Sequence, residues 1–216
     1  MNKAILLPVL LLSLASCSKN RLNGSGDTIT ETRDVSSFTR IEASGSEEVE
    51  VLWASERRVE VSGYRNLVNE YKTNVSGGTL RLRYDSDTWN VRNNNLRVRV
   101  YTPSLEELHA SGSGNVTVIA NGALGLREAE VTGSGNVSIS QPAVNALQLR
   151  VTGSGELNAR DASAKDVEAE TTGSGSIETT ATEELDAKIT GSGNIDYWGS
   201  PRVNTRITGS GEVRSH

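Results

Sequence analysis

A Gly-Ser-Gly triplet recurs six times in the second half of the 216-residue chain, and this repeat constrains the fold more than any other feature. The triplets are separated by 21, 20, 20, 18 and 18 residues. A fixed period of this length is typical of a solenoid, in which each repeat is one coil stacked on the previous coil. The first glycines are Gly112, Gly133, Gly153, Gly173, Gly191 and Gly209, and the second glycines are Gly114, Gly135, Gly155, Gly175, Gly193 and Gly211.

The sequence around the triplets has the two-residue periodicity of β-strands. Leu147, Leu149 and Val151 alternate with polar residues before the triplet at Gly153, and equivalent apolar residues precede the later triplets. Turn formers such as Gln141-Pro142 separate the strands, and helical periodicity is absent. The pattern predicts an all-β fold, a parallel β-helix or β-solenoid, with coils of 18–21 residues.

We interpret each triplet as a structural corner, because glycine tolerates positive φ and has no Cβ, so that identical sharp corners can stack directly. A phosphate-binding loop is an alternative, but such loops lead into a helix and usually carry a Lys or Asp. The calcium-binding nonapeptide repeat needs an Asp after its glycines, whereas Asn, Glu or Ser follows here. Ala43-Ser44-Gly45-Ser46 resembles a degenerate first corner.

A row of charged residues accompanies the corners. Opposite charges one coil apart contribute about 0.2–1 kcal/mol per pair. We predict a solvated salt ladder that also fixes which coil stacks on which. In an enzyme, the same residues would be catalytic acids with positioning cations. The row consists of the third residue before each triplet, His109, Glu130, Arg150, Glu170, Lys188 and Arg206, and its sign alternates from Glu130 to Lys188.

The first half of the chain, residues 27–108, is less regular but still has β patterns, and we expect it to precede a regular solenoid over residues 109–216. No aromatic residue lies between Thr102 and Asp196, so the core there must be thin. Trp53 and Trp89 are predicted to cap or widen the core of the first half. Alternatively, Trp53, Trp89, Tyr197 and Trp198 form an exposed platform on which a glycan stacks.

The N-terminus has the pattern of an export signal. Lys3 precedes an apolar run, which ends in small residues and the sequence Leu14-Ala15-Ser16-Cys17. Cys17 is the only cysteine, so it has no partner for an internal disulfide. The segment resembles the lipobox of bacterial lipoproteins. An ordinary secretory leader with a chance cysteine is the alternative.

The lipobox resemblance implies that residues 1–16 are a signal peptide and that Cys17 carries the lipid and anchors the protein to a membrane. Residues 17–26 are then the lipidated cysteine and a flexible tether, as the Asn23-Gly24-Ser25-Gly26 sequence suggests. Ser18, rather than Asp, follows the cysteine. By analogy with lipoprotein sorting this favours the outer membrane, and the absence of an acidic cluster there slightly favours its periplasmic face over the cell surface.

Composition excludes several functional classes. The net charge of −5 is mixed along the chain, which argues against a nucleic-acid partner. His109 and His216 are the only histidines, and the acids are scattered. We therefore predict no catalytic residue, no metal site and no cofactor. A polysaccharide-degrading β-helix enzyme would need two carboxylates in a concave site. The final coil, with Ile207 and Val213, has no polar cap, so we expect a second copy or an envelope partner to cover it.

Several ordered segments of the chain resemble the putative auto-transporter adhesin, head GIN domain family over about residues 27–213. The resemblance implies an exported protein with a β-helix-like fold and supplies no catalytic residue. We therefore predict a non-enzymatic cell-envelope lipoprotein for adhesion or scaffolding, with a glycan-binding module as the alternative and an envelope protein or glycan as partner. The segments are Phe38-Thr39-Arg40-Ile41, Val49-Glu50-Val51, Val59-Glu60-Val61-Ser62-Gly63, Gly77-Gly78-Thr79-Leu80, Val98-Arg99-Val100-Tyr101-Thr102-Pro103-Ser104-Leu105 and Ser111-Gly112-Ser113-Gly114.

Overall fold

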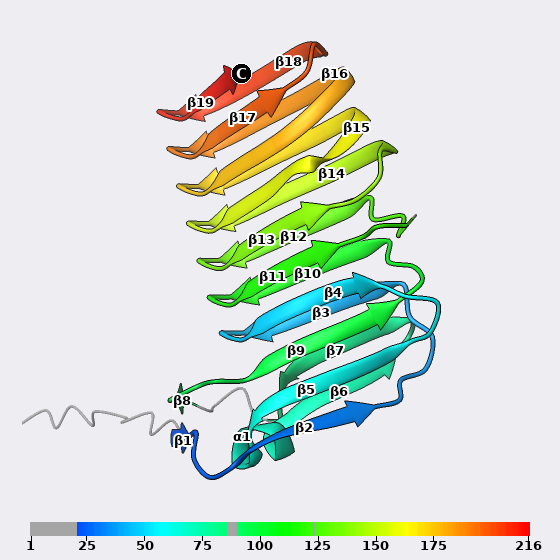
Figure 1. The fold of residues 1–216 in the computed structure, drawn as a ribbon. Coiled ribbons are helices and arrows are strands. Elements are labelled where there is room, and N and C mark those ends of the chain that lie inside the picture. Colours follow the sequence, from blue (N-terminus) through cyan, green and yellow to red (C-terminus); the bar gives the residue numbers. More distant parts are fainter. Residues whose placement is uncertain (1–20, 86–89, 123) are drawn as a thin grey trace, which may run out of the picture.

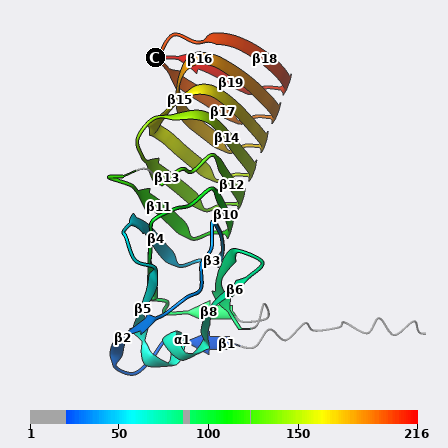
Figure 2. The same ribbon diagram turned by 90° about the vertical axis from the view of Figure 1, so that its right-hand side faces the viewer.

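The described residues form a rod of stacked β-strands with one short helix, α1 (Arg65–Glu70), at its N-terminal end (Figures 1 and 2). The computed structural model describes residues 21–85, 90–122 and 124–216. Cys17 and Trp89 lie outside these ranges. The C-terminus lies at the opposite end of the rod from α1 (Figure 1).

Parallel pairing between successive coils builds the regular part of the rod. Strands that precede a triplet pair with one another, so the first glycines of the triplets are in register from Gly112 to Gly209. Strands that follow a triplet pair in the same way. The predicted β-solenoid is confirmed. Its strands are β10 (Glu107–Gly112), β11 (Asn115–Ile119), β12 (Glu128–Gly133), β13 (Asn136–Ser140), β14 (Val144–Gly153), β15 (Glu156–Gly173), β16 (Ser176–Gly191), β17 (Asn194–Trp198), β18 (Arg202–Gly209) and β19 (Glu212–Ser215).

The N-terminal part continues the rod and then closes it. Strands β3 and β4 form a coil next to β10 and β11, and Gly45 is in register with Gly112, as predicted for the degenerate corner. The next strands, β7 and β9, are still parallel, whereas β2, β5 and β6 pair antiparallel. This part consists of β1 (Arg21–Asn23), β2 (Thr28–Arg33), β3 (Arg40–Gly45), β4 (Glu48–Trp53), β5 (Arg58–Tyr64), β6 (Tyr71–Ser76), β7 (Thr79–Tyr84), β8 (Asn90–Arg92) and β9 (Arg97–Thr102).

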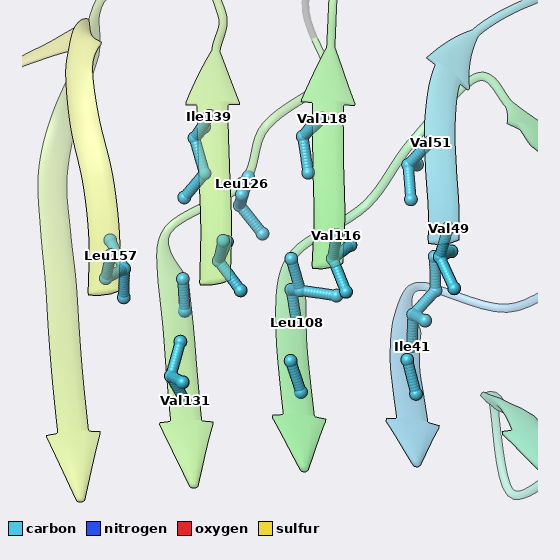
Figure 3. Packing of buried hydrophobic residues seen from close by; sticks show 14 of the residues in the cluster. Ile41, Val49, Val51, Leu108, Val116, Val118, Leu126, Val131, Ile139 and Leu157 are labelled. Atoms are coloured by element: carbon cyan, nitrogen blue, oxygen red, sulfur yellow. The ribbon is translucent and has the colours of Figure 1, made fainter. Parts of the chain in front are cut away.

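A continuous apolar core runs along the inside of the rod. Side chains at equivalent positions of successive coils lie in rows, such as Val49 with Val116 and Val51 with Val118 (Figure 3). Leu147, Leu149 and Val151 are buried as the alternation predicts. The rows of the regular coils are built from Val, Ile, Leu, Ala and a few Thr, so the core is thin, and each coil depends on its neighbours to exclude water.

The segment predicted to be a flexible tether is partly docked, which corrects the boundary at residue 26. Arg21–Asn23 form β1, which pairs in parallel with β8, and Leu22 is buried. The Gly24 N–H donates to the Arg92 carbonyl, and Asn93 Nδ2 donates to the Gly24 carbonyl, both at 2.8 Å. One buried leucine among Gly, Ser and Asn gives no periodic pattern, so the sequence does not reveal this strand.

Candidate functional site

The glycine corners are held together by their own backbones. The N–H groups of Ser154 and Gly155 both donate to the Gly133 carbonyl of the preceding coil, at 2.8 and 3.0 Å. The same pair of hydrogen bonds recurs at each corner from Gly112 to Gly209. Because the neighbouring coil already engages these N–H groups, the triplets do not form anion-binding loops, which supports the interpretation as structural corners.

The two glycines of a triplet exclude a side chain for different reasons. Gly153 has a φ of 120°, and a Cβ there would lie 2.4 Å from the Gly133 carbonyl oxygen. Gly155 does not have a positive φ, but its Cβ would lie 2.3 Å from the Gly135 carbonyl oxygen. Positive φ is therefore a property of the first glycine, whereas close approach of the preceding coil applies to both.

Glu47 ends the column of corners and was not predicted from the sequence. It occupies the second-glycine position of the degenerate corner that begins at Gly45. Its Oε2 accepts from the Ser46 N–H at 3.1 Å, and its Oε1 accepts from Asn94 Nδ2 at 3.0 Å. The side-chain carboxylate thus takes the place that a glycine carbonyl has in the other coils. An acid in place of the second glycine is the sequence signal that could have revealed it.

Burial of Glu47 raises the pKa of its carboxyl group. A buried acid of this kind is a feature of many catalytic sites. The adjoining cavity, however, measures only about 10 Å³, which is room for roughly one water molecule. The Tyr71 side chain lines it, and the buried Tyr71 hydroxyl has no hydrogen-bond partner among the described residues. A sugar does not fit there, so we interpret Glu47 as a cap of the column.

The predicted salt ladder is present on the outer surface, with one change. His109 Nδ1 lies 3.0 Å from Glu130 Oε2, and Lys188 Nζ lies 2.6 Å from Glu170 Oε1. Arg150 was expected to pair with both of its neighbours. It lies 3.9 Å from Glu170, but its closer contact is Glu128, at 3.3 Å in the adjacent row. The reach of an arginine side chain allows this diagonal contact, which stacking order alone does not predict.

An open groove of about 610 Å³ runs over the same face, across β10, β12, β14, β15 and β16. Acidic side chains dominate its lining, and two of these acids have a hydrogen-bond partner one coil away. Glu168 accepts from Gln148 at 2.9 Å, and Glu184 accepts from Arg202 at 2.8 Å. Among the residues that the structure describes, no cluster of three or more His, Cys, Asp or Glu side chains is arranged to hold a metal ion.

Of the four aromatic residues predicted as a ligand platform, the three that the structure describes do not come together: Trp53 ends β4, whereas Tyr197 and Trp198 end β17. Trp53 is 45% exposed and therefore does not widen the core. Tyr197 packs against the core. Trp198 lies between two other side chains, with the Arg160 guanidinium 4.3 Å from its ring centroid and the His216 ring stacked at 4.7 Å. Trp89 lies outside the described residues. Among these three described aromatic residues, Trp53 is therefore the one whose ring remains available to a ligand.

Within the described ranges, no helix is long and apolar enough to span a membrane. The same fold occurs in solved structures. A putative adhesin from Bacteroides fragilis NCTC 9343 has a TM-score of 0.69 and 24% identity, covering 90% of this chain and 100% of that chain. A putative adhesin from Parabacteroides merdae ATCC 43184 has a TM-score of 0.60 and 18% identity, covering 91% and 99%.

A third solved structure, a putative lipid binding protein from Parabacteroides distasonis ATCC 8503, has a TM-score of 0.61 and 25% identity, covering 91% of this chain and 100% of that chain. No curated protein matches the sequence. The model of one protein family matches residues 37–201, from the last residues before β3 to the turn after β17. Because this match spans most of the sequence, the chain belongs to the putative auto-transporter adhesin, head GIN domain family.

Proposed function

We propose that the protein is a non-enzymatic, lipid-anchored module of the cell envelope whose β-solenoid serves adhesion or scaffolding. The observation that carries the proposal is the construction of the rod: its coils are joined by backbone hydrogen bonds at every corner, and its N-terminal segment is tied to one end. Such a rod can hold a contact surface at a fixed distance from its anchor. The partners of this proposal are the membrane, through the anchor, and an envelope protein or glycan, but not nucleic acid.

The proposed anchor would lie close to the rod. Three residues separate Cys17 from Arg21, the first residue of β1. An extended chain advances at most about 3.3–3.6 Å per residue, so the two Cα atoms can be at most about 14 Å apart. A lipid on Cys17 would therefore keep the end of the rod that carries α1 near the membrane. We propose that this membrane is the outer membrane and that the protein is attached to its periplasmic face rather than to the cell surface.

The other end of the rod would then point away from the membrane. The corners from Gly45 to Gly209 span six coil-to-coil steps. At about 4.8 Å per step, the last coil lies about 29 Å beyond the first. The solved relatives reported above are described as putative adhesins or a putative lipid binding protein rather than as enzymes, which supports a binding role.

Replacement of the lipid-bearing residue tests the anchor. We expect Cys17→Ala to abolish acylation and to release the protein from the membrane fraction. The circular dichroism spectrum of the released protein should match that of the wild-type rod, because Cys17 precedes the docked strand β1. Unchanged membrane retention, together with a native N-terminal peptide that lacks acyl mass, would contradict the anchor.

Incubation with envelope polysaccharides tests the non-enzymatic role. The purified protein should produce no new reducing ends and no unsaturated products, with or without calcium. Glu128→Gln and Glu168→Gln provide the decisive variants, because both acids line the acidic groove. Reproducible turnover that disappears in either variant would overturn the proposal.

A further inference from the structure

Trp53 is a partly exposed aromatic residue at the junction between the closed N-terminal part and the regular coils. It ends β4 and is 45% exposed. A Cβ on Gly122 would lie 2.7 Å from Cε2 and 2.9 Å from Cδ2 of the indole, the two atoms that its rings share. The Gly122 backbone therefore supports one flat side of the indole. A ring held in this way loses little conformational freedom when a ligand stacks on the other side.

A small apolar strip lies on the outer face of the sheet, near the ends of the same strands. Leu52, the residue before Trp53, is in register with Ile119 of β11, which is 41% exposed. In the other direction Leu52 is in register with Tyr101 of β9, but the Arg58 guanidinium covers the Tyr101 ring at 3.7 Å. The strip is therefore short and flat. It matches the apolar face of a few sugar rings better than a lipid chain, which needs an enclosed groove.

Arg57 gives the same region an unbalanced positive charge. Its Nε is buried without a hydrogen-bond partner among the described residues, and its Nη2 lies 3.5 Å from Ser104 Oγ. Arg58 is paired with Glu60 at 3.1 Å, whereas no carboxylate of the described chain forms a salt bridge with Arg57. A guanidinium without a carboxylate partner can donate two parallel hydrogen bonds to an external carboxylate from its terminal Nη1 and Nη2 atoms, whereas the buried Nε takes no part.

The topology brings these residues to one cluster of loops. Strands β9, β4 and β11 are successive neighbours and run parallel, so the loops that follow them lie side by side. These loops carry Ser104, Arg57 and Gly122, respectively. The Ala54 N–H donates to the Thr102 carbonyl at 3.0 Å and ties the first two of them together.

We propose that this cluster binds an acidic polysaccharide. The C–H face of a pyranose ring stacks on the exposed side of Trp53, and the carboxylate of a uronic acid pairs with Arg57. The inference rests on the proposed adhesive role, for which it names the ligand class. A neutral glycan would leave the Arg57 guanidinium without a counter-charge, so the site discriminates in favour of acidic chains.

Affinity electrophoresis and calorimetry with the detergent-solubilised full chain test the site. Polygalacturonate is the acidic probe and dextran is the neutral one. We expect binding to polygalacturonate, and a loss of about tenfold or more in affinity for both Trp53→Ala and Arg57→Gln. Arg57→Gln should also remove the preference for polygalacturonate over dextran. Trp198→Phe is the matched aromatic control and should bind as wild type does, because Arg160 and His216 already flank Trp198.

The unfolding transition of each variant shows whether the rod is intact. Should Trp53→Ala fail to fold, the ratio of the two affinities in Arg57→Gln still decides the question. Absence of binding to polygalacturonate at millimolar sugar, or equal binding by wild type and Arg57→Gln, would overturn the proposal. Neither result bears on the proposed lipid anchor, because membrane fractionation of Cys17→Ala tests the anchor independently. Recognition of a protein partner alone would likewise overturn the glycan site and preserve the adhesive role.

Discussion

Individual glycines set the geometry of the corners, and their two requirements can be separated by substitution. Gly153→Val imposes a β-branched residue at a φ of 120° and places Cβ 2.4 Å from a carbonyl oxygen. Strain costs about 1–3 kcal/mol and overpacking about 1–3 kcal/mol. We expect a loss of roughly 2–6 kcal/mol in the free energy of unfolding, measured in urea.

Two further glycines are controls for this prediction. Gly155→Ala tests close approach without positive φ, and Gly26→Ala tests positive φ without close approach, because nothing lies within 4 Å of a Cβ at Gly26. Each of these substitutions should lower the free energy of unfolding by less than Gly153→Val does. A Gly153→Val protein as stable as wild type would refute the role assigned to the corner.

The buried acid at the end of the column makes stability depend on pH. Burial raises the pKa of Glu47 above its ordinary value of 4.5 in the folded state. The stability associated with its proton is therefore fully present below about pH 4.5 and is lost as the pH rises through the higher, folded-state pKa. The Glu47→Gln variant has no titrating group at this position. It also weakens one hydrogen bond, which lowers the free energy of unfolding by about 1–3 kcal/mol at every pH.

We expect the stability difference between wild type and Glu47→Gln to shrink, or to reverse in favour of the variant, between pH 4 and pH 7. Urea unfolding of both proteins across this range measures it. If the stability of wild type and variant changed in parallel with pH, the pKa of Glu47 would be the same in the folded and the unfolded state.

At the scale of the strands, charge order helps to specify which coil stacks on which. Glu170 of β15 lies between Arg150 and Lys188, at 3.9 and 2.6 Å. Glu170→Lys would place three cations in consecutive coils. Like charges directly opposite each other destabilise a sheet by about 0.2–1 kcal/mol per pair. Because the two salt bridges of Glu170 are lost as well, we expect the free energy of unfolding to fall by about 1–2 kcal/mol in total.

Salt provides the test of this prediction, because added ions screen exposed charges. The destabilisation should decrease in 0.5 M NaCl, as measured by urea unfolding. Glu156→Lys is the control, since its neighbours in register are the neutral Asn136 and Ser176. An equal loss in both variants, insensitive to salt, would argue against a ladder.

The elements predicted most accurately are those whose sequence repeats. Stacked coils require identical corners, so glycine spacing and two-residue alternation determine β10 to β19 and their inward residues. The docking of β1 was missed because it depends on one leucine and on backbone hydrogen bonds. The same holds for the candidate site: alternation places Leu52 outward, but the support of Trp53 by Gly122 and the unpaired Arg57 side chain arise from loops that carry no periodic signal.

The two ends of the whole rod differ. Antiparallel strands and α1 close the N-terminal end (Figures 1 and 2). At the other end, β18 and β19 pair with β16 and β17 on one side, and no described strand pairs with their outer edges. Open edges of this kind recruit other strands. Because one end is closed and the other open, two copies joined at the open ends would form a closed dimer rather than a fibre.

Ile207 lies at this open end, in an inward-facing row on which no coil of the described residues stacks further, and it is 43% exposed. We predict that this surface is covered by a second copy or by an envelope partner, so that Ile207→Lys shifts the protein towards the monomer in light scattering. Ile119→Lys is the matched control, since Ile119 is 41% exposed but lies on the side of the rod. The short β19, whose Glu212 and Arg214 pair at 2.6 Å, opposes strand addition through its charges. A strict monomer at high concentration, indifferent to Ile207→Lys and without a partner at this end, would refute the prediction.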